Sequence, residues 1–377
     1  MLDWHFITGE YPPQAGGVSD YNRTLAQALV DAGDRVHVWA PECHSASHSS
    51  ESLVVHRLPG GYGLSGLRAL SAGLAASPGP RRILVQYVPH GFGWKAMNFA
   101  FCRWIQRQAA REPVWTIFHE IAFFDTDTWK HRILTAVSQR IARRIGNASQ
   151  RVFVSTPAWS PLLRGLGVSG PELEWLPIPS SIPAPSAVDA VQSIRAELTR
   201  RGQDNPAIVG HFGTFGSLVW GVLRPVLAAI LRKMPQVVIH LIGRGSQRAI
   251  ADLAGCPGVE RVVVADDLTP EQVATHIAAC DMMLQPFPDG INFRRTSALS
   301  AMKVGRAIVS HSGHNTESLW SEQQLVALAA SMDPNDYVAA VTMLLADDAL
   351  RAAYAQRASA FYETTCALEK IVAQLRK

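Results

Sequence analysis

Short apolar runs alternate with helical stripes along the whole chain. In the first half, runs with the length and composition of buried strands occupy residues 2–8, 35–40, 54–58, 83–88, 114–118 and 152–155. Apolar residues at three- and four-residue spacing predict helices between them, at residues 25–32, 67–76, 95–111, 129–145 and 161–166. Strands that alternate with helices favour parallel sheets, so we predict an α/β fold.

Four prolines among residues 175–186 interrupt this alternation, because proline lacks a backbone donor and cannot continue a helix. We therefore predict an inter-domain linker there. The alternation then restarts, with strands predicted at residues 207–212, 237–242, 261–265, 282–285 and 307–309 and helices between them. Residues 334–377 predict two or three further helices. The chain should thus form two Rossmann-like domains that face each other across a cleft.

The stretch 281–310 has the pattern of a βαβ unit with a polar loop. A short apolar strand ends at two prolines, and a helix begins at Thr296. Open α/β sheets bind ligands at the carboxyl ends of strands, and helix starts favour anions. The loop carries two arginines, Arg294 and Arg295, and the hydroxyls of Thr296 and Ser297. These groups are therefore suited to binding a phosphate. The alternative is a helix cap with two solvated arginines.

Two loops of the first half hold further candidates. Gly16 and Gly17 precede a helix, where backbone N–H groups can approach an anion or a sugar, although a tight turn is the common reason for paired glycines. Their spacing is not that of a dinucleotide fingerprint. His119 ends a strand, so its ring should point into the ligand crevice; the alternative is a structural histidine bonded to a backbone carbonyl.

The helix predicted at residues 129–145 is amphipathic. Trp129, Ile133, Val137 and Ile141 recur at four-residue intervals, and basic residues flank them. A basic amphipathic helix can rest on an anionic membrane, with Arg103, Arg107 and Arg111 nearby in the sequence. The favoured interpretation is a surface helix with solvated arginines.

Composition argues against several classes of protein. The 377 residues are 18% charged and 47% hydrophobic, as expected for a globular chain of about two domains. The net charge of +4 is spread along the chain, so no nucleic-acid partner is expected. The five cysteines form no C-x-x-C pair, which argues against a zinc site. No basic leader or run of ~20 apolar residues is present, so we expect a cytoplasmic protein.

Three loops would bring cationic or donor groups to the predicted cleft. They are Gly16–Gly17, the loop from Gly213 to Ser217 together with Arg244, and Arg294–Arg295. Such a cleft suits a nucleotide-activated substrate.

The residues on these loops resemble a known family. The segment EYPPQAGGVSDYNRTLAQALVDAGDRVHVWAP resembles the N-terminal signature of family 4 retaining glycosyltransferases, and so does the block from VGHFGTFG through LIGRGS to ALSAMKVGRAIV. The resemblance covers nearly the whole chain and implies the GT-B fold. Residues 1–178 would form the acceptor-binding domain and residues 179–358 the nucleotide-sugar-binding domain, with a C-terminal helix at 359–377 that packs back on the first domain.

The Glu-x7-Glu motif of that family is altered here. Ser300 stands where the second Glu, which grips the nucleotide ribose, would precede Ala301-Met302. Counting back eight residues gives Asn292, whereas the Pro-x-x-Glu-Gly turn of the family matches Asp289-Gly290. We expect Asp289 to contact the donor sugar, because its carboxylate can accept from sugar hydroxyls.

The Arg and Lys with which the family holds the diphosphate are also missing. Thr214 and residues 219–221 occupy that region. Arg294 and Arg295 are unusual for the family, and we expect them to replace that charge, because a guanidinium binds phosphate oxygens bidentately.

The resemblance implies a hexosyltransferase of glycan or glycoconjugate biosynthesis that uses a nucleotide-diphosphate sugar, such as a UDP or GDP sugar. The acceptor would be a sugar, a lipid-linked molecule or a small molecule, and front-face attack would retain the anomeric configuration. No metal or other cofactor is expected, and the acidic pair Asp266-Asp267 sits at a strand end and should cap a turn. Peripheral contact with the inner membrane face is a side prediction.

The residues expected at the site fall into three groups. The expected catalytic residues are His119, Asp289, Arg294 and Arg295. Donor binding is expected from Gly16, Gly17, Gly213, Thr214, Arg244, Gly290, Asn292, Thr296 and Ser297. Acceptor binding is expected from Tyr11, Tyr21, Tyr87 and Glu120.

Two other functions fit the same residues. The first is a catalytically silent nucleotide- or sugar-binding GT-B protein that regulates or scaffolds a partner, because Ser300 removes a motif carboxylate. An epimerase on the same fold is the weaker alternative, because its acid and base carboxylates are not recognisable here.

Overall fold

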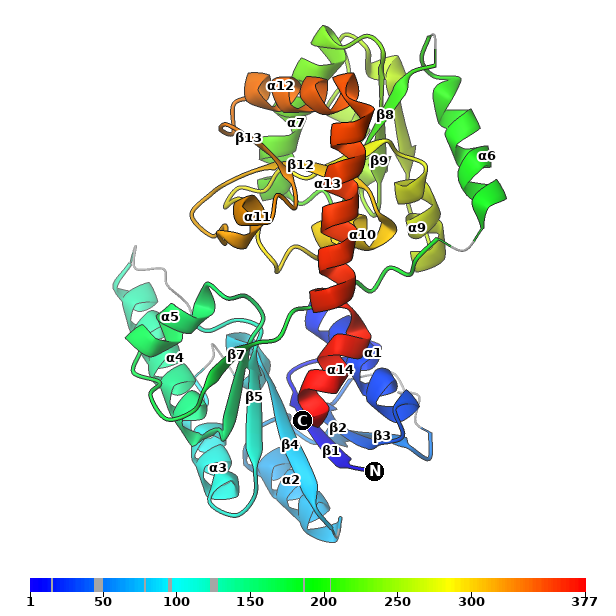
Figure 1. Cartoon of the computed structure of the whole chain (residues 1–377). Helices are drawn as coiled ribbons and strands as arrows, with labels where there is room; N and C mark the ends of the chain where they lie inside the picture. Colours follow the sequence, from blue (N-terminus) through cyan, green and yellow to red (C-terminus); the bar gives the residue numbers. More distant parts are fainter. Residues whose placement is uncertain are drawn as a thin grey trace. The chain divides into compact units, whose positions relative to one another are not determined.

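The computed structural model describes residues 1–14, 16–43, 50–77, 79–93, 97–122, 128–185, 187–203 and 205–377. These residues divide into two compact units, each of which has one parallel sheet with helices on its faces (Figure 1). The first unit comprises Met1–Ile178 with Leu368–Lys377, and the second comprises Pro179–Ala367. The predicted α/β class with two Rossmann-like domains is confirmed.

The sheet of the first unit has seven parallel strands in the order β3-β2-β1-β4-β5-β6-β7. Their bounds are β1 Asp3–Thr8, β2 Arg35–Pro41, β3 Leu53–Leu58, β4 Arg81–Tyr87, β5 Val114–Phe118, β6 Arg151–Val154 and β7 Leu173–Trp175. Every residue of β1 is buried, because helices cover both faces of the sheet. The three-residue strand β7 was not predicted, since Leu173–Trp175 shows no apolar run.

Helices cover the two faces of this sheet with separate cores. One core contains Ile7, Trp39 and Val85 and is covered by α2–α5, and the other contains Trp4, Phe6 and Leu84 and is covered by α1 and α14. The helices are α1 Gly17–Asp31, α2 Leu64–Ala76, α3 Phe99–Ala109, α4 Trp129–Ala148, α5 Trp159–Gly165 and α14 Leu368–Arg376, with a 3₁₀ turn at Pro89–Phe92. The helix predicted at residues 95–111 begins at Phe99 in the structure, and residues 95 and 96 of that prediction lie outside the described part of the chain.

The sheet of the second unit has six parallel strands in the order β10-β9-β8-β11-β12-β13. The strands are β8 Ala207–Phe212, β9 Val237–Ile242, β10 Val262–Ala265, β11 Met282–Leu284, β12 Ala307–His311 and β13 Ala327–Ala329. The helices are α6 Val188–Thr199, α7 Ser217–Lys233, α8 Ser246–Ala251, α9 Pro270–Ala278, α10 Thr296–Val304, α11 Leu319–Glu322, α12 Pro334–Ala346 and α13 Asp348–Phe361. Strand β13 and helix α11 were not predicted.

The end of the chain returns to the first unit. Helix α13 ends in a π-helical turn at Tyr362–Cys366, and residues 359–367 pack with the second unit, whereas the sequence had grouped them with the terminal helix. Helix α14 then packs beside α1 (Figure 1). The Arg376 guanidinium pairs with the Asp34 carboxylate at 3.2 Å, and Arg82 donates to the Leu375 carbonyl at 2.8 Å.

Candidate functional site

The loops at the carboxyl ends of the second unit's strands lie against one another. Gly243, after β9, has a φ of +113°, and a Cβ there would collide with the carbonyl oxygen of Gly213, after β8. Asp266, at the end of β10, accepts from the Gly245 N–H at 3.1 Å and thus caps the turn, as expected. Ligands of open α/β sheets bind at this edge.

Two helices of this unit begin at the same edge without a side-chain cap. The N-caps of α7 and α10 are Gly216 and Arg295, and neither accepts a backbone N–H with its side chain. Gln285 connects the two loops: its Nε2 donates to the Phe212 carbonyl at 3.2 Å, and its Oε1 accepts from Ser297 Oγ at 3.2 Å. Uncapped helix N-termini attract anions, because their N–H groups carry partial positive charge.

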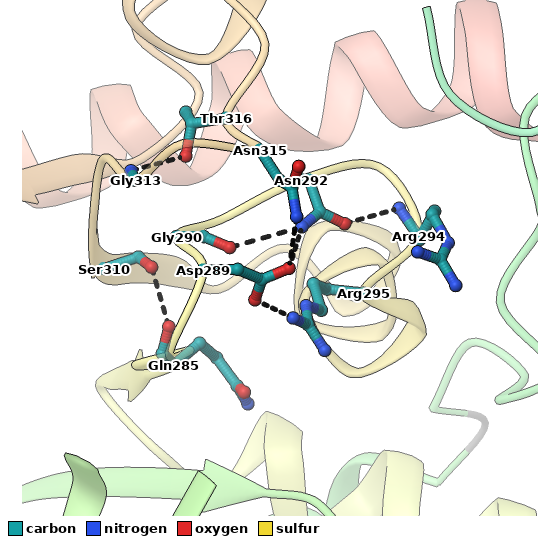
Figure 2. A network of polar contacts seen from close by, with 10 residues as sticks. All are labelled: Gln285, Asp289, Gly290, Asn292, Arg294, Arg295, Ser310, Gly313, Asn315 and Thr316. Atoms are coloured by element: carbon teal, nitrogen blue, oxygen red, sulfur yellow. Dashed lines mark hydrogen bonds and ion pairs between the residues drawn. The ribbon is translucent and has the colours of Figure 1, made fainter. Parts of the chain in front are cut away.

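Asp289 is the centre of the polar network in Figure 2. Its carboxylate pairs with Arg295 Nη2 and accepts from Asn315 Nδ2 at 3.0 Å and from Asn292 Nδ2 at 3.4 Å. Burial acts to raise the pKa of Asp289, but the Asn315 hydrogen bond and the Arg295 charge together lower the pKa below its usual value. The Arg295 guanidinium also lies over the Phe287 ring, 4.6 Å from its centroid. The positive charge of Arg295 is therefore neutralised within the loop by the Asp289 carboxylate.

The backbone of the same loop is fixed against the loop after β12. Gly290 has a φ of +85°, and a Cβ there would collide with the Gly313 nitrogen. The Asn315 N–H donates to the Asp289 carbonyl at 3.1 Å. The Arg294 N–H donates to Asn292 Oδ1 at 3.2 Å, and the Arg294 side chain extends away from Asp289 (Figure 2).

The remaining donor candidates differ in exposure. Thr214, Arg244, Arg294 and Thr296 are exposed at the strand ends, whereas Asn292 is buried. Ser300 is also buried; its Oγ donates to the Thr296 carbonyl at 2.8 Å and lies 2.8 Å from Ser180 Oγ. The position of the expected ribose-binding Glu is thus filled by a hydroxyl that is engaged inside the unit.

His211 is a candidate that sequence reasoning missed. It is buried in β8, and its Nδ1 donates to the Leu284 carbonyl at 2.8 Å. Its Nε2 has no hydrogen-bond partner in the described part of the chain and lies beside Gly213. Burial lowers the pKa of His211 to about 4, so the ring is neutral and Nε2 is an acceptor. The sequence does contain a signal for this candidate: His211 stands one residue before the end of a predicted strand, and a glycine loop follows that strand.

A row of polar residues crosses the carboxyl edge of the first unit's sheet. Thr8, Gln86, His119 and Ser155 stand at the ends of the neighbouring strands β1, β4, β5 and β6. His119 is buried, its Nε2 lies 2.8 Å from Gln86 Oε1, and the Tyr21 ring packs edge-on at 4.9 Å. Since the Gln86 oxygen can only accept, a neutral His119 carries its proton on Nε2.

Four buried polar atoms near this row have no hydrogen-bond partner among the described residues. They are Tyr21 Oη, Asn22 Oδ1, Gln86 Nε2 and Ser155 Oγ. Buried polar groups are nearly always hydrogen-bonded, so these atoms indicate a site where water or a ligand hydroxyl supplies the partner.

The Gly16–Gly17 turn faces a carboxylate. Glu10 Oε1 accepts from the Ser19 N–H at 2.9 Å, and a Cβ on Gly16 would collide with the Glu10 carboxylate. Glu10 thus already serves the N-terminus of α1, and its charge opposes an additional anion. Donor binding by Gly16 and Gly17 stays a prediction.

The acceptor candidates do not form one cluster. Tyr11 and Tyr21 are buried in the core under α1, whereas Tyr87 packs with Phe92 and Phe118 in the core on the other face of the sheet. Glu120 follows His119 and pairs with His90, with Oε2 and Nε2 3.4 Å apart. Of the four candidates, Tyr21 packs against the His119 ring, Glu120 follows His119 in the chain, and the Tyr87 carbonyl accepts from the His119 N–H at 3.0 Å while the Tyr87 ring lies in the other core.

The described residues include no group of three or more His, Cys, Asp or Glu side chains that could hold a metal ion. No helix in the described part of the chain is both long and apolar enough to cross a bilayer.

Comparisons with known sequences give one consistent result. A glycosyl transferase 4-like domain matches residues 16–179, and the group 1 glycosyl transferases match residues 209–347. A phosphatidyl-myo-inositol mannosyltransferase from Mycolicibacterium smegmatis is 26% identical over 359 residues, which cover 91% of this chain and 85% of that protein.

Solved structures share the architecture over the whole length. Sucrose-phosphate synthase from Thermosynechococcus elongatus has a TM-score of 0.74 at 18% identity, covering 100% of this chain and 97% of that one. HepE from Anabaena, in complex with UDP and glucose, has a TM-score of 0.67 at 17% identity, covering 100% and 98%. At these identities the likeness shows the fold. The two domain matches, the mannosyltransferase relative and this architecture together show that the chain belongs to the family 4 glycosyltransferases and has the GT-B fold.

Proposed function

We propose that this glycosyltransferase moves a hexosyl group from a nucleotide-diphosphate sugar to an acceptor hydroxyl with retention of configuration and without a metal ion. One observation carries the proposal: the N-termini of α7 and α10 are uncapped, begin at the same sheet edge and are connected through Gln285. Arg244 and Arg294 are exposed in the loops of that edge. Together these groups suit a diphosphate.

The positive groups have a direct role in the chemistry. When the glycosidic bond to the β-phosphate breaks, negative charge grows on the leaving phosphate, and fixed N–H dipoles and guanidinium groups stabilise that charge. Because these groups supply the charge that a divalent ion would otherwise supply, chelation by EDTA should leave turnover unchanged. The leaving phosphate oxygen accepts the acceptor's proton as the acceptor attacks from the same face.

The side chains then divide by unit. In the second unit, Arg294 binds the diphosphate and the Asp289 loop contacts the donor sugar. In the first unit, His119 lies at the reacting sugar and the acceptor binds near Glu120. The names of the relatives support these classes of substrate: HepE was solved with UDP and with UDP-glucose, and the mannosyltransferase acts on a phosphatidyl-myo-inositol.

The acceptor proposed here includes lipid-linked molecules, which require access to a membrane surface. Helix α4 contains no acidic residue, and Trp129 and Ile133 near its start are 67% and 51% exposed. The Lys130 ammonium lies over the Trp129 ring at 5.7 Å. Flotation with anionic liposomes tests this contact; binding at low salt that falls with added salt supports it, and absence of binding at low salt removes it.

A panel of UDP-, GDP- and dTDP-sugars tests the donor class. We expect calorimetric binding of at least one donor, its slow hydrolysis without acceptor, and no change with EDTA. Failure of every donor to bind or hydrolyse would contradict the proposal.

A further inference from the structure

The imidazole of His211 lies against the loop that leads from β8 into helix α7. His211 is 1% exposed, and a Cβ on Gly213 would stand 3.0 Å from its Nε2. A glycine at position 213 therefore keeps a side chain out of the space next to Nε2. The loop ends at the N-terminus of α7, a helix of 17 residues that Gly216 leaves without a side-chain cap. His211 thus lies at the base of a loop whose end attracts anions.

The orientation of the His211 ring is fixed. Its Nδ1 donates to the Leu284 carbonyl at 2.8 Å, and since a carbonyl oxygen can only accept, the neutral ring has its lone pair on Nε2. The Phe215 ring packs edge-on against the imidazole, with 5.3 Å between the centroids. Phe215 has a φ of +53°, a strained conformation for a bulky residue. Backbone strain of this kind is frequent at ligand sites.

The Nε2 lone pair is incompatible with an anion at this helix start. Nε2 is buried and has no hydrogen-bond partner among the described residues, whereas buried polar atoms nearly always have one. A diphosphate bound by the N–H groups of α7 would turn oxygens, which are acceptors, toward a second acceptor. A proton on Nε2 removes this repulsion and replaces it with a charge-assisted hydrogen bond.

The surroundings of the ring allow a bound anion to control its charge. Burial and the hydrogen bond to the Leu284 carbonyl are the two influences that set the pKa of His211 at about 4, and neither is a charge. The neighbouring strands β9 and β11 contain one titratable residue, His240, whose Nε2 bonds to His276 instead. Because an opposite charge beside a buried histidine raises its pKa, a diphosphate at Nε2 would favour the imidazolium.

The α7 side of the proposed diphosphate site also lacks a positive side chain of its own. The loop from Gly213 to Ser217 contains no basic residue. Across the edge, the Arg295 guanidinium is paired with the Asp289 carboxylate. A protonated His211 would add a positive charge at the loop that lacks one.

We propose that His211 holds the donor diphosphate as an imidazolium. The ring takes a proton from solvent when the diphosphate binds, donates from Nε2 to a phosphate oxygen, and returns the proton when the nucleoside diphosphate leaves. As negative charge grows on the leaving phosphate, this hydrogen bond strengthens, so His211 is a further catalytic residue of the transfer. The assignment rests on the proposed function.

Proton uptake on binding is measured by calorimetry with UDP-glucose and GDP-mannose in buffers of different ionisation enthalpy. Each phosphate of these donors is disubstituted and lacks the second ionisation of a phosphate monoester. His211→Asn keeps an N–H that can donate to the Leu284 carbonyl and removes Nε2. His240→Asn is the matched control: His240 is 1% exposed in β9, its Nδ1 lies 3.2 Å from the Val263 carbonyl oxygen, and its Nε2 has a partner.

We expect the parent and His240→Asn to take up at least about 0.5 proton per donor bound at pH 6. Proton uptake means that the pKa of His211 is higher in the complex than in the free protein, so the donor should bind more tightly as the pH falls. The parent should bind at least about twofold more tightly at pH 6 than at pH 8. His211→Asn should take up less than about 0.1 proton and bind equally at both pH values.

Long-range proton–nitrogen NMR of the parent observes Nε2 directly and does not require a folded variant. The Nε2 resonance should change from that of a lone-pair nitrogen to that of an N–H nitrogen when the donor binds at pH 6. Donor binding without proton uptake in the parent, uptake that persists in His211→Asn, or an unchanged Nε2 resonance would each overturn the inference and leave the proposed function standing. A parent that binds neither donor would contradict the proposed function and this inference with it.

Discussion

Replacing Arg295 with alanine separates a structural role of this residue from a phosphate-binding role. Its guanidinium pairs with Asp289, and the two side chains are 29% and 19% exposed. An exposed ion pair contributes about 0.2–1 kcal/mol, whereas breaking a buried one costs about 3–5 kcal/mol. For this partly buried pair we expect the free energy of unfolding of the second unit to fall by about 2 kcal/mol.

Thermal unfolding followed by circular dichroism measures the loss. A unit of this size shifts by about 2–4 °C per kcal/mol, so the Tm of Arg295→Ala should fall by about 4–8 °C. Arg294→Ala is the matched variant, because the Arg294 side chain extends away from Asp289 (Figure 2). Its Tm should fall less than that of Arg295→Ala, because Arg294 is exposed and does not pair with Asp289. Its UDP or GDP binding should weaken by about 1.5–3 kcal/mol, the range for a charged hydrogen bond.

A double-mutant cycle with Asp289→Asn and Arg295→Met isolates the pair, and the two losses should add up to more than the loss of the double variant. The reasoning is refuted if Arg295→Ala keeps the parent Tm and abolishes nucleotide binding. Arg295 would then be the phosphate ligand, and its pairing with Asp289 would be incidental.

Three further predictions concern the first unit. Burial and neighbouring charges lower the pKa of His5 to about 3, that of His56 to about 4, and that of His37. Because the folded state binds fewer protons than the unfolded one, the free energy of unfolding should fall as the pH drops below 6.5. For His5 alone the loss should reach about 2 kcal/mol at pH 5. Urea unfolding measures this loss, and midpoints that stay constant from pH 7 to pH 5 would contradict the prediction. His119→Ala should lower turnover at least about tenfold and leave the affinity for UDP or GDP, measured by calorimetry, within about twofold. An equal loss of turnover and of nucleotide affinity would contradict the assignment of His119 to the reacting sugar. Glu10→Gln should destabilise α1 by about 1 kcal/mol, because its charge faces the helix N-terminus, and an unchanged Tm would argue against that role.

The strands were the most predictable part of the fold. Residues 207–212, 237–242 and 114–118 were predicted with the bounds that the structure shows, because strands buried on both faces are uninterrupted apolar runs. The strands β7 and β13, of three residues each, were not predicted, and Leu173–Trp175 shows no apolar run of the kind that marks β11. Helix α1 begins at Gly17, before the stripe that starts at Leu25, since its first turns are polar.

The candidate loops could be proposed from the sequence, but the contacts that their side chains make could not. Loops after strands and before helices mark the ligand edge of any open α/β sheet, so His119 and the loop of Arg294 could be proposed from the sequence. That Arg295 pairs with Asp289 depends on side-chain directions in an irregular loop. That Glu10 serves the N-terminus of α1 depends on the direction of its side chain, which no periodicity encodes.

The most direct test of a retaining transfer is a proton NMR time course of the donor that binds, with the hexose released in the absence of acceptor identified before it mutarotates. From an α-linked donor we predict that the nucleoside diphosphate and the α-anomer appear together and first. Initial release of the β-anomer, or no consumption of any donor that binds, would contradict the account.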